Sequence, residues 1–141
     1  MTGSAAGYSG TPLARKLGVR PGETAWRKAM PEAIAEEIAS SGIVQHVVAA
    51  PEPGLAFAHV FETRRSALEA DLEALRTLLA PTGMVWVSWP KKAAKVETDI
   101  TEDVVRAVAL PLGFVDVKVC AVDAVWSGLK LVVRKALRTA G

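Results

Sequence analysis

The sequence predicts an α/β fold in which a mostly parallel sheet carries helices on both faces and ends in an antiparallel hairpin. Short valine-rich runs alternate with amphipathic helical segments, a pattern typical of parallel strands joined by helices. The 141 residues, 50% of them hydrophobic, suffice for one domain with a sizeable core. The last two strand-like runs have no helix between them, which predicts that they pair antiparallel.

A short helix is the first predicted element. Thr11 is its expected N-cap, Pro12 suits its first turn, and Gly18 ends it. Residues 24–29 form a weak strand candidate, because polar side chains stand where a central strand normally carries aliphatic ones. Pro31 then opens a second helix.

Two further strands are predicted over residues 43–49 and 55–61, separated by a link that contains two prolines and a glycine. The link at 50–54 is too short for a crossover helix. The two strands therefore either pair antiparallel or are joined by an extended loop, and the sequence leaves both alternatives open.

The clearest helix covers residues 64–80. Its leucines recur at spacings of three and four, at Leu68, Leu72, Leu75 and Leu79. Residues 84–89 follow as a short strand that is apolar on both faces, as an interior parallel strand should be. Asp99 and Glu102, three residues apart, match a capping pattern and predict a helix that runs to about Leu110.

The final hairpin is predicted from residues 114–122 and 129–133, with the turn signal Trp126-Ser127-Gly128 between them. In the first of these strands, Val115, Val117 and Val119 are expected on one face. A mostly parallel sheet that closes with an inserted antiparallel strand is typical of small, three-layer, Rossmann-like folds of the methyltransferase kind. We expect a flexible tail over residues 1–8 and a single domain over residues 9–138.

Composition excludes several classes of protein. The 17 basic and 15 acidic residues leave a net charge of +2, which is too small and too evenly spread to predict nucleic-acid or membrane binding. A single cysteine excludes an internal disulfide framework and a Cys-rich zinc module. The chain has no apolar run of the roughly 18–20 residues that a membrane span needs, and no secretory signal at its start. We therefore expect a cytoplasmic location.

Four blocks of sequence resemble a known bacterial family. They are GYSGTPL at 7–13, VSWPKK at 87–92, TDITE at 98–102, and VDVKVCAVD at 115–123 with WSGLK at 126–130. In this order they are similar to the family catalogued as domain of unknown function 3052. The resemblance implies a small Rossmann-like, methyltransferase-like domain, and it assigns no activity and no functional residues. One departure lies at residues 26–33, where the family has an aliphatic first strand and an Ala-Pro-Glu-Gly-like turn.

A cofactor is not expected. Nucleotide-type cofactors on such folds usually need a glycine-rich turn after the first strand and an acidic residue that ends the second. Residues 23–41 contain no glycine, and Ala49, Ala50 and Pro51 follow the second strand. Methyl transfer from S-adenosylmethionine therefore ranks third among the candidate functions, because a fold alone does not define an activity.

Neither a catalytic residue nor a metal site is predicted. His46 and His59 both fall inside strands, without further ligands at metal-binding spacing, and we interpret them as hydrogen-bonded core or half-buried residues. Cys120 has no adjacent base that would activate its thiol and is interpreted as structural.

The candidate site follows from topology, because ligands of open parallel sheets bind beyond the carboxyl ends of the strands. Cations, indoles and a hydroxyl are expected at this edge: Arg64, Arg65, Trp89, Lys91, Lys92, Lys95, Trp126 and Ser127. They predict an anion-binding cleft for a phosphate-bearing metabolite, a nucleotide or an acidic partner segment. The alternative is a set of solvated loop charges, balanced by the acidic residues Glu97, Asp99, Glu102 and Asp103.

The predicted function is thus a non-catalytic, Rossmann-like domain that binds a small anionic ligand at the carboxyl edge of its sheet. The alternative is a pseudoenzyme that docks on a protein partner or on a second copy of itself, with Trp126-Ser127-Gly128 and the edge of the final hairpin as the cue. Nucleic-acid binding ranks last, because the sequence contains no recognition helix and no RNA-binding motif.

Overall fold

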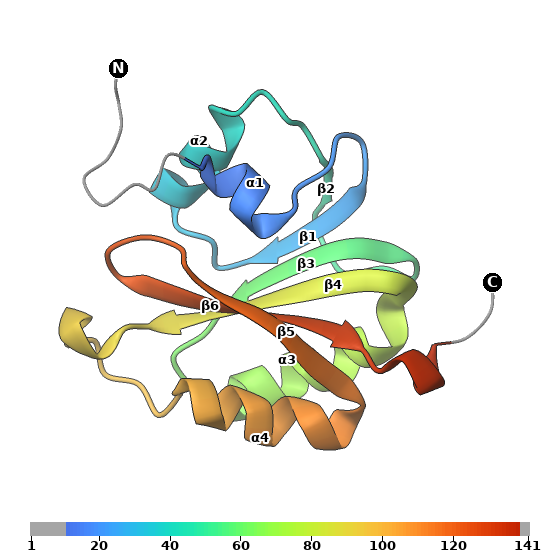
Figure 1. Cartoon of the computed structure of the whole chain (residues 1–141), viewed down its shortest axis with the longest axis vertical. Helices are drawn as coiled ribbons and strands as arrows, with labels where there is room; N and C mark the ends of the chain where they lie inside the picture. Colours follow the sequence, from blue (N-terminus) through green and yellow to red (C-terminus); the bar gives the residue numbers. More distant parts are fainter. Residues whose placement is uncertain (1–10, 139–141) are drawn as a thin grey trace.

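A computed structural model describes residues 11–138, so the tail expected over residues 1–8 lies outside the described part of the chain. Its helices and strands follow in the predicted order (Figure 1). They are α1 (Leu13–Leu17), β1 (Thr24–Lys28), α2 (Glu32–Ala39), β2 (His46–Val48), β3 (Leu55–Phe61), α3 (Arg65–Leu78), β4 (Leu79–Pro90), η1 (Lys92–Ala94), α4 (Glu102–Leu112), β5 (Phe114–Ala121), β6 (Trp126–Val133) and η2 (Lys135–Leu137).

The strands form one sheet in the order β2-β1-β3-β4-β6-β5. The first four are parallel, and β6 runs antiparallel to both of its neighbours, β4 and β5. This confirms the predicted fold class with its closing hairpin. Strands β2 and β3 flank β1, since Ala25 lies opposite Val47 on one side and opposite Phe57 on the other. The link at 50–54 is therefore the extended loop of the two alternatives.

Helices cover both faces of the sheet, α1 and α2 on one side and α3 and α4 on the other (Figure 1). Each pair of helices buries an apolar cluster against the strands, which gives the three predicted layers. Trp86 of β4 is fully buried, and its indole N–H donates to the Leu17 carbonyl at 2.8 Å. This bond anchors α1 to the sheet. None of the helices within residues 11–138 is long and apolar enough to cross a membrane.

Two predicted helix caps are wrong. Helix α1 begins after Pro12 without a side-chain cap, so Thr11 does not fill that role. At α4 the N-cap is Thr101, whose hydroxyl accepts the Val104 N–H at 3.2 Å. Asp99 caps α3 instead, because its carboxylate accepts the backbone N–H of Arg65 at 2.6 Å. The chain brings the α3 start beside Asp99, a partner 34 residues away that a local pattern does not show.

The predicted face of β5 is also wrong. The pairing with β6 shifts between Asp116 and Lys118, which makes Val117 the extra residue of a bulge. Val115 lies opposite Val132 and Val119 opposite Leu129, three residues apart on β6 and hence on opposite faces. Val117 and Val119 are both about half exposed, because β5 is the edge strand.

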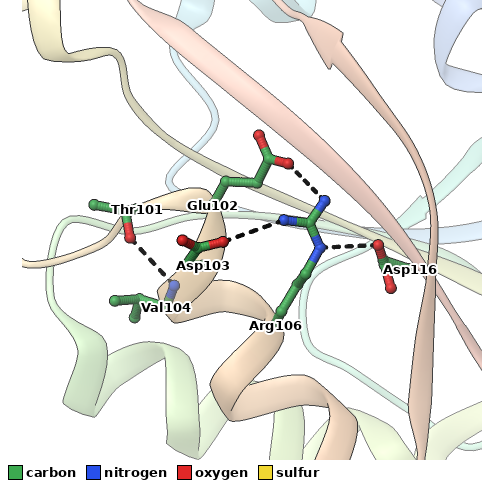
Figure 2. A network of polar contacts seen from close by, with 6 residues as sticks. All are labelled: Thr101, Glu102, Asp103, Val104, Arg106 and Asp116. Atoms are coloured by element: carbon green, nitrogen blue, oxygen red, sulfur yellow. Dashed lines mark hydrogen bonds and ion pairs between the residues drawn. The ribbon is translucent and has the colours of Figure 1, made fainter.

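An ion-pair network ties α4 to β5 (Figure 2). The Arg106 guanidinium is 2.9 Å from the Asp116 carboxylate on β5, and it also pairs with Glu102 and Asp103 on its own helix. These bonds raise the pKa of Arg106 and lower that of Asp116. They hold the start of α4 in place beside the sheet edge at which the candidate site lies.

Candidate ligand site at the carboxyl edge

A cleft of about 510 Å³ lies beyond the carboxyl end of β3, where the sequence places its candidate site. Its walls are the turn between β3 and α3 and the segment that leads into α4, with the lining residues Thr63, Arg64, Glu97, Thr98 and Asp99. The volume falls within the range of small-molecule sites, roughly 300–1,000 Å³.

Backbone and hydroxyl bonds join the two walls of this cleft. The Thr98 hydroxyl donates to the Thr63 carbonyl at 2.7 Å, and the Asp99 N–H donates to the same oxygen at 3.2 Å. Together with the cap from Asp99 to the N–H of Arg65, these bonds fix the geometry of the cleft. Its shape is therefore formed before any ligand arrives.

The exposed charges of the cleft are available to a ligand. Among residues 11–138, the Arg64 guanidinium and the Glu97 carboxylate have no ion-pair or hydrogen-bond partner. The acids that sequence analysis offered as balancing charges are partly engaged elsewhere: Glu102 and Asp103 pair with Arg106, and Asp99 caps α3. Arg64 is thus a cation without an ion-pair partner among residues 11–138, in a cleft that Glu97 and Asp99 also line.

The other predicted cations do not line the cleft. The Arg65 guanidinium pairs with Glu69 at 3.0 Å, one turn further along α3. Lys92 and Lys95 are exposed in and just after η1, within the segment that leads to the cleft wall. Lys91 is held by its backbone N–H, which donates to the Val125 carbonyl at 2.7 Å, and its charge acts on the thiol of Cys120. The five cations therefore spread along the edge, and Arg64 alone enters the cleft lining.

The two predicted indoles stand at the carboxyl edge but on opposite faces of the sheet. Trp89 is 6% exposed and packs into the cluster under α3 and α4. Trp126 packs edge-to-face on Phe61 in the cluster on the other face, with ring centroids 5.1 Å apart. The register explains this, since Trp89 lies opposite Ser127 and successive side chains of a strand alternate between faces. They do not form a shared aromatic wall.

The residues that suggested a docking edge for a protein partner do not lie at an edge of the sheet. Residues Trp126-Ser127-Gly128 belong to β6, which is hydrogen-bonded to β4 on one side and to β5 on the other. The hairpin does form a sheet edge, but it does so through β5.

A charge cluster beside the cleft, with two buried carboxylates and a partly exposed lysine, was not predicted from the sequence. Lys28 ends β1, Glu62 directly follows β3, and Asp71 lies on α3. The Lys28 ammonium is 2.7 Å from the Glu62 carboxylate and 2.8 Å from that of Asp71. The two acidic side chains are only 10% and 8% exposed. One signal was present: Asp71 lies three residues after Leu68 and four before Leu75, on the flank of the leucine stripe.

Burial shifts the proton equilibria of this cluster. Burial and the neighbouring Glu62 carboxyl group raise the pKa of Asp71 to about 7, although Lys28 opposes the change. Burial lowers the pKa of Lys28, but its bonds to Asp71 and Glu62 outweigh that effect and raise it overall. The cluster thus holds a carboxyl group that changes its charge near neutral pH.

His59 lies on the face of the sheet that α1 and α2 cover, where it stacks on Phe61. It confirms the prediction of a core histidine. It is fully buried, and its Nε2 lies 2.8 Å from the Ser88 hydroxyl. Burial, with a smaller effect of the Arg27 charge, lowers its pKa to about 3, so the ring is neutral at physiological pH. His46 is exposed instead.

Cys120 is not activated, since burial raises the pKa of its thiol. Within residues 11–138, no three His, Cys, Asp or Glu side chains are arranged to hold a metal ion.

The turn after β1 does not fit a nucleotide-type cofactor. Ala29 stands there with a φ of 57°, in the left-handed region that glycine adopts freely. The preceding residue, Lys28, is bound to Glu62 and Asp71, and strand β2 ends at Val48 without a carboxylate that could hold a ribose. The turn after β1 thus has no glycine, and the end of β2 has no carboxylate, where such cofactors usually find both.

Solved structures of methyltransferases share the fold. A protein assigned as a type 11 methyltransferase, from Sulfolobus solfataricus, superposes with a TM-score of 0.64 over 91% of this chain and 93% of its own, at 10% identity. A SAM-dependent methyltransferase from Aquifex aeolicus gives 0.57 over 86% and 88%, at 15% identity. The DhpI–SAH complex gives 0.56 over 87% and 82%, at 14% identity. No family model and no curated protein matches the sequence. The chain therefore has a methyltransferase-like Rossmann fold.

Proposed function

We propose that this domain binds a small molecule through an anionic group, in the cleft beyond β3, and that it does so without catalysis. The observation that carries the proposal is the preformed cleft of about 510 Å³, lined by Arg64, whose guanidinium has no ion-pair partner among residues 11–138. Guanidinium groups bind phosphate and carboxylate groups with paired hydrogen bonds. Family membership with domain of unknown function 3052 is part of the same proposal.

The acidic wall narrows the class of ligand. Glu97 and Asp99 line the same cleft as Arg64. A ligand with a negative group alone would be repelled by these carboxylates, whereas one that also carries an amine would pair with both walls. We therefore favour aminoalkyl phosphates and amino acids, which combine the two charges.

Methyl transfer is not favoured by the residues present. The three methyltransferase-like structures are at most 15% identical in sequence to this chain. A shared fold does not by itself transfer an activity. The turn after β1 has no glycine for close approach of a methyl donor, and Lys28 beside it is paired with Glu62 and Asp71.

Isothermal titration with sulfate, phosphoethanolamine and S-adenosylhomocysteine tests the proposal. We expect phosphoethanolamine to bind more tightly than sulfate, and Arg64→Ala to lose both. Arg20→Ala is the matched control, because Arg20 is exposed before β1, at the opposite end of the parallel strands. Equal binding to the Arg64→Ala and native proteins would refute the site, and tight binding of S-adenosylhomocysteine would favour the methyltransferase reading. A stable dimer that binds none of the three would favour the interaction module.

A further inference from the structure

The cluster of Lys28, Glu62 and Asp71 joins three elements at the carboxyl edge, with both carboxylates buried and the Lys28 side chain 38% exposed. Lys28 is the last residue of β1, Glu62 follows β3, and Asp71 lies in the second turn of α3. The Lys28 ammonium is within 2.8 Å of an oxygen from each carboxylate. The cluster therefore links α3 to the two strands by charge, in addition to the leucines that α3 buries in the core.

Its charges do not balance when both acids are ionised. One cation then serves two carboxylates that are at least nine-tenths buried. The Asp71 Oδ2 has no hydrogen-bond partner among residues 11–138, and the Glu62 Oε2 has no hydrogen-bond donor besides its ion pair with Lys28. Two buried acceptors without a donor are costly, and a proton on one of them turns it into a donor for the other.

Among residues 11–138, no further charged group acts on the Asp71 carboxyl. Of the described residues, only Lys28 and Glu62 act on the Asp71 carboxyl by charge or by hydrogen bonding. Asp71's neighbours one turn away on α3, Ala67 and Leu75, are apolar. In the neutral form of the cluster, Asp71 thus carries a proton beside the Glu62 carboxylate.

The cluster is continuous with the wall of the cleft. Glu62 is followed by Thr63 and Arg64, which line the cleft, and the Thr63 carbonyl holds the opposite wall through Thr98 and Asp99. A movement of Glu62 therefore acts directly on its neighbour Thr63. Through the bonds that the Thr63 carbonyl accepts, it acts on both walls of the cleft.

We propose that Lys28, Glu62 and Asp71 form a proton-operated switch that controls ligand occupancy of the cleft. With the proton bound, the cluster is neutral and α3 is held against β1 and β3. When the proton leaves, the cluster carries one net negative charge, and the two carboxylates repel each other. The added charge and the loosened turn both weaken binding of an anionic group at Arg64. Affinity falls as pH rises, with a midpoint near the pKa of Asp71, about 7.

The proton switch is tested without any ligand. Carbon-detected NMR of the side-chain carboxyl groups should show Asp71 titrating near neutral pH, together with the backbone amides of Thr98 and Asp99 across the cleft. Asp71→Asn should remove the shared transition, and Glu62→Gln should move it to lower pH. Glu73→Gln is the matched control, because Glu73 is an exposed acid on the same helix. A spectrum without a carboxyl midpoint between about pH 6 and pH 8 would overturn the switch.

The ligand arm rests on the proposed function and uses sulfate, whose charge is constant in this range. The dissociation constant of sulfate should rise about fivefold or more between pH 6 and pH 8 in the native chain. A fivefold change is the lower end of the coupling usually found between two sites. The dissociation constant should stay nearly unchanged in Asp71→Asn. Parallel changes in both proteins would overturn the coupling. A native chain that binds neither sulfate nor phosphoethanolamine at any pH refutes the proposed function, while the amides of Thr98 and Asp99 still decide the switch.

Discussion

The turn after β1 offers a direct test of backbone strain at the carboxyl edge. Ala29 is exposed and has a φ of 57°. An L-residue in the left-handed region costs about 1–2 kcal/mol, whereas glycine pays no such penalty. Glycine also loses more backbone entropy on folding, about 0.5–1 kcal/mol. Ala29→Gly should therefore raise the free energy of unfolding by roughly 0.5–1 kcal/mol, the difference between these two terms.

The measurement is urea unfolding followed by tryptophan fluorescence, with the thermal midpoint as a second readout. A gain of this size should raise the midpoint by about 2–4 °C in a domain of this length. Ala74→Gly is the matched control, because Ala74 is exposed inside α3 and the same substitution should cost about 1 kcal/mol there. If Ala29→Gly destabilises the protein as much as Ala74→Gly does, the inference of strain at Ala29 is wrong.

Three further predictions follow from single contacts. Because folding raises the pKa of Asp71 from 3.8 to about 7, the folded chain holds a proton that the unfolded chain has already released. The free energy of unfolding should therefore fall as pH rises from about 4 to 7, by at most about 1.4 kcal/mol per pH unit. A fall of equal slope in Asp71→Asn would contradict this prediction. Asp99→Ala removes the bond to the Arg65 N–H and should lower the free energy of unfolding in urea by about 1 kcal/mol, with faster hydrogen exchange in the first turn of α3. Unchanged exchange in that turn would contradict the cap. Trp86→Phe leaves the Leu17 carbonyl without its donor and should cost about 2–4 kcal/mol by thermal unfolding, so a loss below about 1 kcal/mol would show that this bond does not anchor α1.

The sequence determined the elements whose pattern is local. The leucine spacing in α3 and the alternation of strands with helices follow from the periods of 3.6 and 2 residues, which the backbone imposes wherever the partners lie. The closing hairpin was predictable because no helix lies between its two strands. The buried, hydrogen-bonded His59 was predictable because it falls inside an apolar strand. So was the edge of the sheet that carries Arg64, because the carboxyl ends of parallel strands meet on one side.

Tertiary structure alone decided which distant side chains become partners. Asp99 caps α3 rather than α4 because the crossover returns it to the end of β3, and Lys28 meets Glu62 and Asp71 because β1 lies between β2 and β3. Strand register, with one bulge in β5, decided which face each valine and indole occupies. Local sequence does not encode these contacts, since strand order and register are selected by the packing of the whole sheet against its helices.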